Sequence, residues 1–300
     1  MRLSFRINVH KDYDLLSSVH SWIYPDIQPV PEITATSHFG RVYELGGEKV
    51  VLLIHQKTPG APLRVQYSLT DVDKQTLRSL IRRTLNLGFD LSEALSQMKD
   101  DPKISHLVPQ VAGIRPYMSP TPYEALIKTI IQQQISYRSA NLFTKRMVLG
   151  LTVPVYFENQ NWYHFPDAKT ISTTGIDGLR EFGFGYKVDY IHRAANLVEI
   201  GKIDLDSLIG IPYNEVSAAL KPIHGIGDWT IRVLSLAGLG NFSVFAYDDL
   251  VIQRILGNLY NSGKRLNTKE VRNLAQKWGD SGTIVLYLLM CAEVLGFLKT

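Results

Sequence analysis

The segment that most constrains this chain is residues 220–230, which read Leu-Lys-Pro-Ile-His-Gly-Ile-Gly-Asp-Trp-Thr. Apolar spacing on either side predicts two short helices joined by this turn, a helical hairpin spanning residues 214–239. Gly225 and Gly227 allow positive φ and leave the backbone bare, so amide N–H groups can approach a phosphate closely. The start of the second helix adds partial positive charge at the same place. The hairpin therefore favours contact with a nucleic-acid backbone without sequence readout.

An acidic pair, Asp248 and Asp249, precedes the apolar run Leu-Val-Ile at the predicted start of a helix over residues 249–260. Aspartate in that position is usually an N-cap, and a Gly-x-Gly turn is common between helices that bind nothing. One carboxylate suffices for a cap, however. The second is therefore available for chemistry beside a strand bound by the hairpin, and the combination is more specific than either part.

Three segments resemble motifs of the helix-hairpin-helix DNA glycosylase superfamily, and they follow one another in the family's order. Gly-Ile-Gly-Asp-Trp-Thr at 225–230 resembles the hairpin, Asp-Leu-Val-Ile-Gln-Arg at 249–254 resembles the catalytic-aspartate motif, and residues 122–136 resemble the opening helix. The similarity covers roughly residues 110 to 295 and is closest to the alkylpurine branch, the inducible-type 3-methyladenine DNA glycosylases. It implies a base excision repair enzyme that acts, as a monomer, on damaged bases in double-stranded DNA.

The resemblance places the catalytic carboxylate at Asp249 and leaves Asp248 for capping or structure. A damaged base must be rotated out of the duplex to be reached. Breaking its N-glycosidic bond leaves oxocarbenium-like positive charge on the deoxyribose, which Asp249 would stabilise while it orients the attacking water. Bifunctional members carry a Schiff-base lysine where this chain has Trp229, so the sequence predicts a monofunctional glycosylase without lyase activity.

The resemblance also implies which residues contact DNA. Ile135, which follows Gln134, corresponds to the apolar residue that fills the gap left by the flipped base, although an ordinary core position has the same helical spacing. Phosphate-facing amides are expected from Gly225, Gly227 and Thr230. The hairpin carbonyls expected to coordinate a structural monovalent cation, Na⁺ or K⁺, are those of Lys221, Ile223 and Gly225. No other cofactor is expected.

The expected base pocket keeps one aromatic residue of the family's pattern, Trp229, whose electron-rich face suits cationic 3-methyladenine and 7-methylguanine. The other pocket positions implied by the match are Val233, Leu250 and Met290. Two of them, Val233 and Met290, stand where the alkylpurine branch often has aromatic residues. The candidates to compensate are Tyr247, Tyr137 and Phe5.

Two other functions stay open. Phe-Gly-Phe-Gly-Tyr-Lys at 182–187 resembles a segment of the 8-oxoguanine glycosylases, so excision of oxidised purines is the alternative enzymatic activity. The absence of the Schiff-base lysine at position 229 argues against it. A non-catalytic damaged-DNA-binding module is the alternative of another class. A pure binder would have no use for Asp249, because that carboxylate would repel phosphate.

Composition is compatible with this function and decides little. A net charge of +4 and a pI near 8.9 permit nucleic-acid binding without a polybasic signature. Cys291 is the single cysteine, which excludes an intramolecular disulfide framework and the four-cysteine iron–sulfur cluster of other branches. The sequence shows neither a signal-like start nor an apolar segment of membrane-spanning length. We therefore expect an intracellular protein, in the cytoplasm or nucleoid, or in the nucleus of a eukaryote.

The fold expected is α+β. Four runs of β-branched and aromatic residues predict strands, at 3–9, 33–43, 49–56 and 63–69, and turn signals such as Gly46-Gly47 separate them. An amphipathic helix is predicted next, over residues 71–87. From residue 121 onward nearly every segment has helical spacing, and Thr-Pro-Tyr-Glu at 121–124 predicts a capping box. A length of 300 residues suggests two domains. We predict an antiparallel-sheet domain with helices over residues 1–105 and a helical catalytic domain over 106–300.

Overall fold

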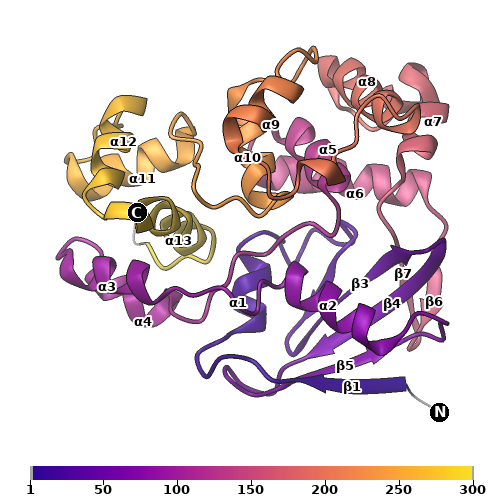
Figure 1. The fold of residues 1–300 in the computed structure, drawn as a ribbon, viewed down its shortest axis with the longest axis horizontal. Helices are drawn as coiled ribbons and strands as arrows, with labels where there is room; N and C mark the ends of the chain where they lie inside the picture. The colour runs from indigo at the N-terminus through magenta and orange to yellow at the C-terminus, as the bar shows by residue number, and fades with distance from the viewer. Residues whose placement is uncertain (1–2, 299–300) are drawn as a thin grey trace.

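The computed structural model describes residues 3–298 and confirms the α+β class, with an antiparallel sheet followed by helices (Figure 1). The sheet has five strands in the order β1-β5-β4-β3-β2, and every neighbouring pair is antiparallel. Its strands are β1 (Leu3–Ile7), β2 (Ile33–Ala35), β3 (His38–Leu45), β4 (Glu48–His55) and β5 (Leu63–Tyr67).

Two short turns set the register of the central strands. The predicted Gly46-Gly47 turn joins β3 to β4, and both glycines have positive φ, +58° and +85°, as a two-residue hairpin loop requires. The single strand predicted over residues 33–43 is wrong, because a turn at Thr36-Ser37 divides it into β2 and β3, which pair with each other. That turn contains neither glycine nor proline, so the sequence carries no strong signal for it.

Different elements cover the two faces of the sheet. Helices α1 (Leu15–His20) and α2 (Lys74–Thr84) share one apolar core with one face. On the opposite face lies an unpredicted hairpin of β6 (Val155–Phe157) and β7 (Gln160–Trp162). Trp162 of this hairpin is 1% exposed and packs against alternate strand residues, Val42, Val51 and Leu53. The hairpin therefore buries this second face at β3 and β4, whereas Ser4 and Arg6 of β1 and Arg64 of β5 stay exposed.

The rest of the chain is helical, as predicted. In chain order its helices are α3 (Ser92–Asp100), α4 (Val108–Val111), α5 (Pro122–Gln132), α6 (Tyr137–Leu151), α7 (Ala168–Arg180), α8 (Val188–Glu199), α9 (Tyr213–Leu220), α10 (Asp228–Ala237), α11 (Leu250–Tyr260), α12 (Thr268–Gln276) and α13 (Gly282–Val294). Within residues 3–298 none of these helices has the length and apolar character needed to cross a membrane.

The start of α5 confirms one half of the predicted capping box and contradicts the other. The Thr121 hydroxyl accepts the N–H of Glu124 at 3.1 Å, and a proline occupies the first helical position. The Glu124 carboxylate does not return to the cap. It lies 2.7 Å from Nη2 of Arg41 and 2.6 Å from Nζ of Lys128, so ion pairing with the sheet replaces the second capping bond. This buried cluster fastens α5 to β3.

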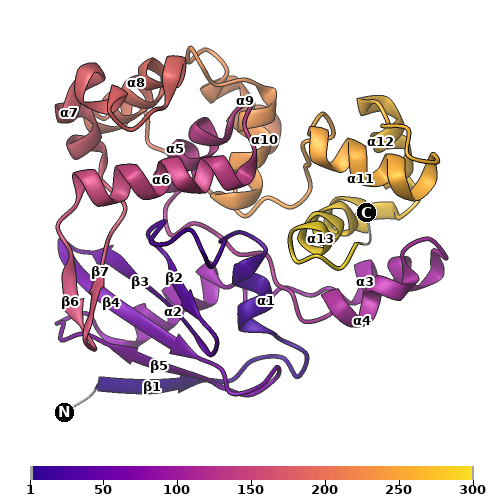
Figure 2. The same ribbon diagram turned by 180° about the vertical axis from the view of Figure 1, so that it is seen from behind.

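The helices form two groups with separate apolar cores (Figure 2). Helices α5 to α10 share one core, and α11 to α13 share another with α3 and α4. Residues on both sides of the expected domain boundary at residue 105 belong to that second core, among them Met98 and Val111. The chain thus enters the C-terminal group of helices twice, before α5 and after α10.

Candidate active site and nucleic-acid interface

The predicted hairpin is formed by α9, the turn 221–227 and α10. Gly225 has a φ of +93°, and a Cβ there would lie 2.3 Å from the ring of Tyr190, so the turn accepts only glycine. Gly227 does not use a positive φ: its φ is −99°, and it is the N-cap of α10 in extended conformation. A Cβ on Gly227 would meet nothing within 4 Å, so the backbone there is open to an approaching partner.

The hairpin, the chain after α5 and the segment before α8 line one open groove. Its lining residues are Gln133, Gln134, Tyr186, Tyr190, Lys221, Pro222, Ile223, His224, Gly225, Ile226 and Gly227. The first N–H groups of α10 have no acceptor inside the helix, so they are available to an anion at this groove. The groove therefore joins segments that lie far apart in the sequence into one surface suited to a phosphate backbone.

Gln134 and Ile135 lie at this groove in different environments. Gln134 is exposed and has a φ of +56°, an uncommon value for a residue other than glycine. Its Oε1 accepts the hydroxyl of Tyr186 at 2.8 Å. Ile135 is partly buried and packs against the core of α5 to α10. Sequence reasoning missed Tyr186, which is 53% exposed; an aromatic residue directly after Gly-Phe-Gly was the available signal.

Thr230 contributes to the hairpin from inside. It is 2% exposed, and its hydroxyl accepts the side-chain amide of Gln133 at 3.0 Å. The same amide nitrogen donates to the carbonyl of Gly225 at 2.8 Å. The carbonyl of Ile223 accepts the N–H of Ile226. A carbonyl oxygen has two lone pairs, so Ile223 and Gly225 each retain one for the expected cation, which stays a prediction.

The acidic pair has divided roles, and the division differs from the prediction. Asp249, rather than Asp248, is the N-cap of α11: its Oδ1 accepts the N–H of Val251 at 2.8 Å. Asp249 immediately precedes the helix and has extended φ and ψ, so its side chain reaches that N–H. Asp248 lies one residue earlier and pairs instead with Arg232 of α10 at 3.2 Å.

The second oxygen of Asp249 faces the hairpin. Oδ2 accepts the indole N–H of Trp229 at 3.1 Å. No lysine, arginine or histidine within residues 3–298 forms an ion pair with Asp249, whereas the charge of Asp248 is compensated. The partly buried carboxylate is therefore oriented by two neutral donors and keeps its charge available for a cation that forms beside it.

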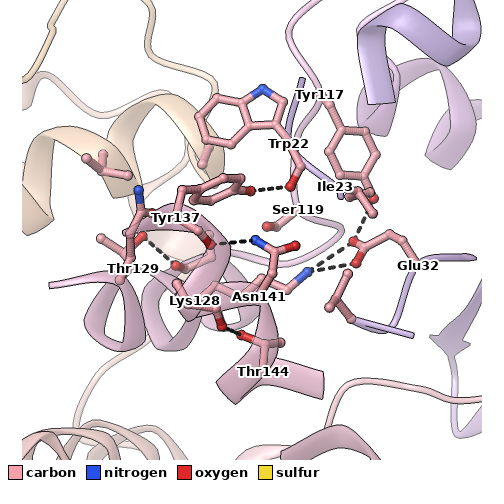
Figure 3. Close-up of a pocket in the computed structure, with 16 residues that line it drawn as sticks. Trp22, Ile23, Glu32, Tyr117, Ser119, Lys128, Thr129, Tyr137, Asn141 and Thr144 are labelled. Atoms are coloured by element: carbon pink, nitrogen blue, oxygen red, sulfur yellow. Dashed lines mark hydrogen bonds and ion pairs between the residues drawn. The ribbon is translucent and has the colours of Figure 1, made fainter. Parts of the chain in front are cut away.

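A cavity of about 60 Å³ lies behind α10, where α5 and α6 meet the N-terminal part (Figure 3). Val233, one turn after Trp229, lines it together with Trp22 and Tyr137. The Trp22 ring stacks on Tyr287 at 5.8 Å and donates its indole N–H to the Tyr287 hydroxyl at 2.5 Å. Tyr137 stands edge-on to Trp22 at 5.7 Å. Two aromatic rings are thus held rigidly in the cavity wall.

The polar end of this cavity is internally satisfied. Fully buried Glu32 accepts Arg41 at 2.6 Å, the hydroxyl of Tyr117 at 2.8 Å, and Lys128 at 3.0 Å. Burial would raise the pKa of Glu124, but the charges of Arg41 and Lys128 and their hydrogen bonds outweigh it and hold that pKa below its usual value. These charged groups therefore mainly bind one another, and a ligand would meet the aromatic faces together with polar side chains such as Ser119 and Gln132.

Val233 is the only one of the four predicted pocket residues that lines the cavity; Trp229 contacts Asp249 instead. Leu250 is 63% exposed beside Asp249, and Met290 packs against the core of the C-terminal helices. Neither lines the cavity. Of the three aromatic residues considered as compensation, only Tyr137 lines it. Phe5 belongs to the sheet core, and Tyr247 lies under the guanidinium of Arg272.

Comparison with known proteins agrees with this geometry. Residues 127–281 match the family described as HhH-GPD superfamily base excision DNA repair protein. The alkylbase DNA glycosidase-like protein mag2 of Schizosaccharomyces pombe is 26% identical over 193 residues, 63% of this chain and 87% of that protein. The structure of a 3-methyladenine DNA-glycosylase from Archaeoglobus fulgidus superposes with a TM-score of 0.85 at 25% identity, covering 98% of this chain and 100% of that one.

A second structural relative has a different named activity. The 8-oxoguanine glycosylase/lyase of Clostridium acetobutylicum, in complex with double-stranded DNA, superposes with a TM-score of 0.76 at 16% identity, and 98% of each chain is covered. At that identity the likeness establishes a common fold. The whole architecture, sheet and helices together, therefore occurs in proteins with different lesions as substrates.

Proposed function

The chain belongs to the HhH-GPD superfamily of base excision DNA repair proteins, and we propose that it is a monofunctional DNA glycosylase that releases alkylated purines from duplex DNA. The observation that carries the proposal is the position of Asp249. Its carboxylate is oriented by the Val251 N–H and the Trp229 indole, and Trp229 belongs to the helix that completes the hairpin. Backbone binding and a carboxylate for chemistry are thus joined in one unit.

In this mechanism the hairpin groove holds the phosphates that flank the lesion. The N–H groups at the start of α10 bind the backbone, and the carbonyls of Lys221, Ile223 and Gly225 would hold a Na⁺ or K⁺ ion that would supply further positive charge beside the phosphates. The damaged nucleotide rotates out of the helix. Gln134 and Ile135 fill the space it leaves, and exposed Tyr186 stands beside them to contact the adjoining bases.

Asp249 then acts on the sugar of the flipped nucleotide. The bond between C1′ and the base nitrogen breaks, and its electron pair leaves with the base, which neutralises the charge of an alkylated purine. Positive charge develops at C1′ and the ring oxygen, where the carboxylate stabilises it. Water adds to C1′ and releases a proton, which Asp249 can accept and pass to solvent. The products are a free base and an abasic site in an intact strand.

Aromatic walls support alkylated purines as the substrate class. Trp229 stands at the carboxylate, and Trp22 and Tyr137 line the cavity beyond Val233. Ring faces attract a cationic base more strongly than a neutral one. The names of the fission-yeast protein and of the Archaeoglobus enzyme point to the same class.

The surroundings of the lysines support hydrolysis without a lyase step. The position of the hairpin motif where a lysine would form a Schiff base is Trp229. Nearby Lys221 pairs with Asp228 at 3.0 Å, and Lys128 in the cavity is bound by Glu32 and Glu124. Both ammonium groups are engaged in ion pairs with carboxylates, so neither is free to reach a sugar carbon without losing those partners.

Excision of oxidised purines is the second candidate. Val233 favours it, because a small aliphatic residue one turn after Trp229 leaves room for a base without demanding a cation. The segment at 182–187, with exposed Tyr186, also resembles that branch.

The test is base release from a duplex treated with a methylating agent, beside a duplex that contains 8-oxoguanine, with wild type and Asp249→Asn. We expect wild type to release free methylpurines and to leave abasic sites without nicks, and Asp249→Asn to bind the duplex without release. Release from the 8-oxoguanine duplex alone would select the second candidate. Tight binding with no release from either would assign the protein to non-catalytic damage binding.

A further inference from the structure

The chain segment that follows α5 is held by a buried lysine from another element. Lys187, which precedes α8, is 3% exposed. Its ammonium group lies 2.5 Å from the carbonyl oxygen of Ile131 and 3.1 Å from that of Gln133. The last carbonyls of a helix have no partner inside the helix and carry partial negative charge. Lys187 therefore caps the C-terminus of α5 and also binds the first residue of the loop that follows it, Gln133, which lines the groove.

A buried ammonium ion is a costly cap. Desolvation lowers the pKa of Lys187, and no carboxylate within residues 3–298 forms an ion pair with it. The desolvation cost of the ammonium group is thus offset only by its hydrogen bonds to carbonyl oxygens and by the partial negative charge at the end of the helix. A neutral side chain or an exposed terminus would close an ordinary helix at lower cost. The arrangement indicates that the exact course of the chain at residues 131–134 matters.

The same loop is fixed to the hairpin through the side chain of Gln133. Its amide nitrogen donates to the carbonyl of Gly225 and to the hydroxyl of Thr230. Lys187 holds the main chain of Gln133 while Gly225 and Thr230 hold its side chain. The loop, the segment before α8 and the hairpin consequently meet at one residue.

The contacts at Gln133 fix the conformation of the next residue, Gln134. It follows Gln133 directly, is exposed, and has a left-handed φ of +56°, a conformation that costs about 1 kcal/mol or more for a residue with a Cβ. Its side chain is held by the Tyr186 hydroxyl, next to Lys187 in sequence. A conformation of this cost persists where the surroundings fix the chain on both sides.

We propose that Lys187 and Gln133 are positioning residues that set Gln134 and Ile135 in the conformation that fills the gap left by a flipped nucleotide, and that couple this loop to the hairpin. The inference rests on the proposed function, because it assumes that the loop enters DNA. The proposal distinguishes binding to an undamaged duplex from binding to a duplex in which a nucleotide is missing from the stack. Contact of the hairpin with phosphates is needed on any duplex, whereas a preset loop is needed only where a nucleotide is absent from the stack.

The test compares affinities for a duplex with a tetrahydrofuran abasic analogue and for the same duplex undamaged. The variants are Lys187→Met, which keeps the aliphatic stem and removes the charge, and Lys187→Arg, which restores a cation. Lys202→Met serves as the control, because Lys202 is an exposed lysine after the other end of α8. Fluorescence of a 2-aminopurine placed beside the analogue reports on stacking by the loop.

We expect Lys187→Met to weaken binding of the abasic duplex by about tenfold and to leave binding of the undamaged duplex within about twofold. The variant loses the hydrogen bonds that hold the loop, and the loop contributes to binding only where a nucleotide is missing from the stack. The 2-aminopurine signal should change in parallel, Lys187→Arg should recover most of both, and Lys202→Met should match wild type. An equal loss on both duplexes, or no loss on either with the fold intact, would overturn the proposal.

A second variant protects the test against misfolding. Gln133→Met removes the bridge to Gly225 and Thr230 while Lys187 stays in place, and it should reduce the preference for abasic DNA in the same way. If Lys187→Met does not fold by circular dichroism, an unchanged preference in Gln133→Met overturns the coupling. Binding to the abasic analogue needs no base release, so failure of the glycosylase proposal would leave this result readable.

Discussion

The indole nitrogen of Trp229 lies 3.1 Å from Oδ2 of Asp249, which follows it by 20 residues and caps a different helix. This bond joins the helical hairpin to the candidate catalytic carboxylate. Oδ1 is used by the cap of α11, so the two oxygens are fixed from two helices. A carboxylate held in this way cannot rotate when the sugar beside it becomes positive, which is the condition for preorganised electrostatic stabilisation.

Removing the indole donor should slow base release without weakening DNA binding. Trp229→Phe keeps an aromatic ring and removes the hydrogen bond to Asp249, so we expect the single-turnover rate to fall about tenfold. Trp278→Phe is the matched control, because the Trp278 indole also donates to an aspartate, Asp101, at 3.2 Å, far from the hairpin. Equal rate losses in the two variants would mean that the bond to Asp249 has no special role.

The sequence predicted the parts of the site that depend on local spacing. Trp229 and Asp249 were assigned by their resemblance to the family's motifs, and their roles stay predictions. The glycine turn was predicted because its residue types have a direct physical reason. The Gly46-Gly47 hairpin was found for the same cause. Asp248 was assigned to capping or structure, and it forms an ion pair with Arg232. The cap provided by Asp249 itself was not predicted, because which of two adjacent aspartates caps a helix depends on where the helix begins, to one residue.

The parts that were missed depend on contacts between distant segments. Nothing near Lys187 in the sequence indicates that its ammonium reaches the end of α5, 56 residues earlier. Trp22 follows α1 in the N-terminal part and reaches the cavity through contacts with distant residues, Tyr137 and Tyr287. Glu124 had the spacing of a capping box, but Arg41, 83 residues away, competes for its carboxylate.

An aromatic wall that recognises charge should discriminate between cationic and neutral bases. Tyr137→Leu removes a ring from the cavity, and we expect kcat/KM for 7-methylguanine to fall about tenfold, while release of neutral hypoxanthine changes less. Tyr247→Leu is the control, because Tyr247 is also a partly buried tyrosine but does not line the cavity. Parallel losses for both bases would indicate that Tyr137 only supports the fold.

The buried cluster between the sheet and α5 should dominate stability at that junction. Arg41→Met leaves Glu32 and Glu124 buried with Lys128 as their remaining cation, and we expect the free energy of unfolding to fall by about 3–5 kcal/mol. Urea unfolding at neutral pH measures it. Arg180→Met, which breaks an exposed ion pair with Asp177, should change stability by less than about 1 kcal/mol. A small effect of Arg41→Met would show that water enters the cluster.

Mild acid should destabilise the fold through histidines that are partly buried. Burial lowers the pKa of His20, His38, His55 and His164 below the ordinary value of 6.5. Below pH 6.5 the unfolded chain therefore binds protons that the folded chain does not, so the free energy of unfolding falls as the pH decreases from 6.5 through the lowered values. At pH 7.5 these histidines are neutral in the unfolded chain as well, so the free energy of unfolding is not reduced by their protonation.

The urea midpoint should accordingly be lower at pH 5.5 than at pH 7.5, a range chosen above the titration of most carboxylates. In the double variant His20→Gln and His164→Gln the midpoint should depend less on pH, because each of these rings has a buried nitrogen without a hydrogen-bond partner and its protonation is disfavoured in the folded state. His106→Gln, which changes an exposed histidine, should keep the wild-type dependence. An undiminished dependence in the double variant would instead assign the acid sensitivity to groups other than these two histidines.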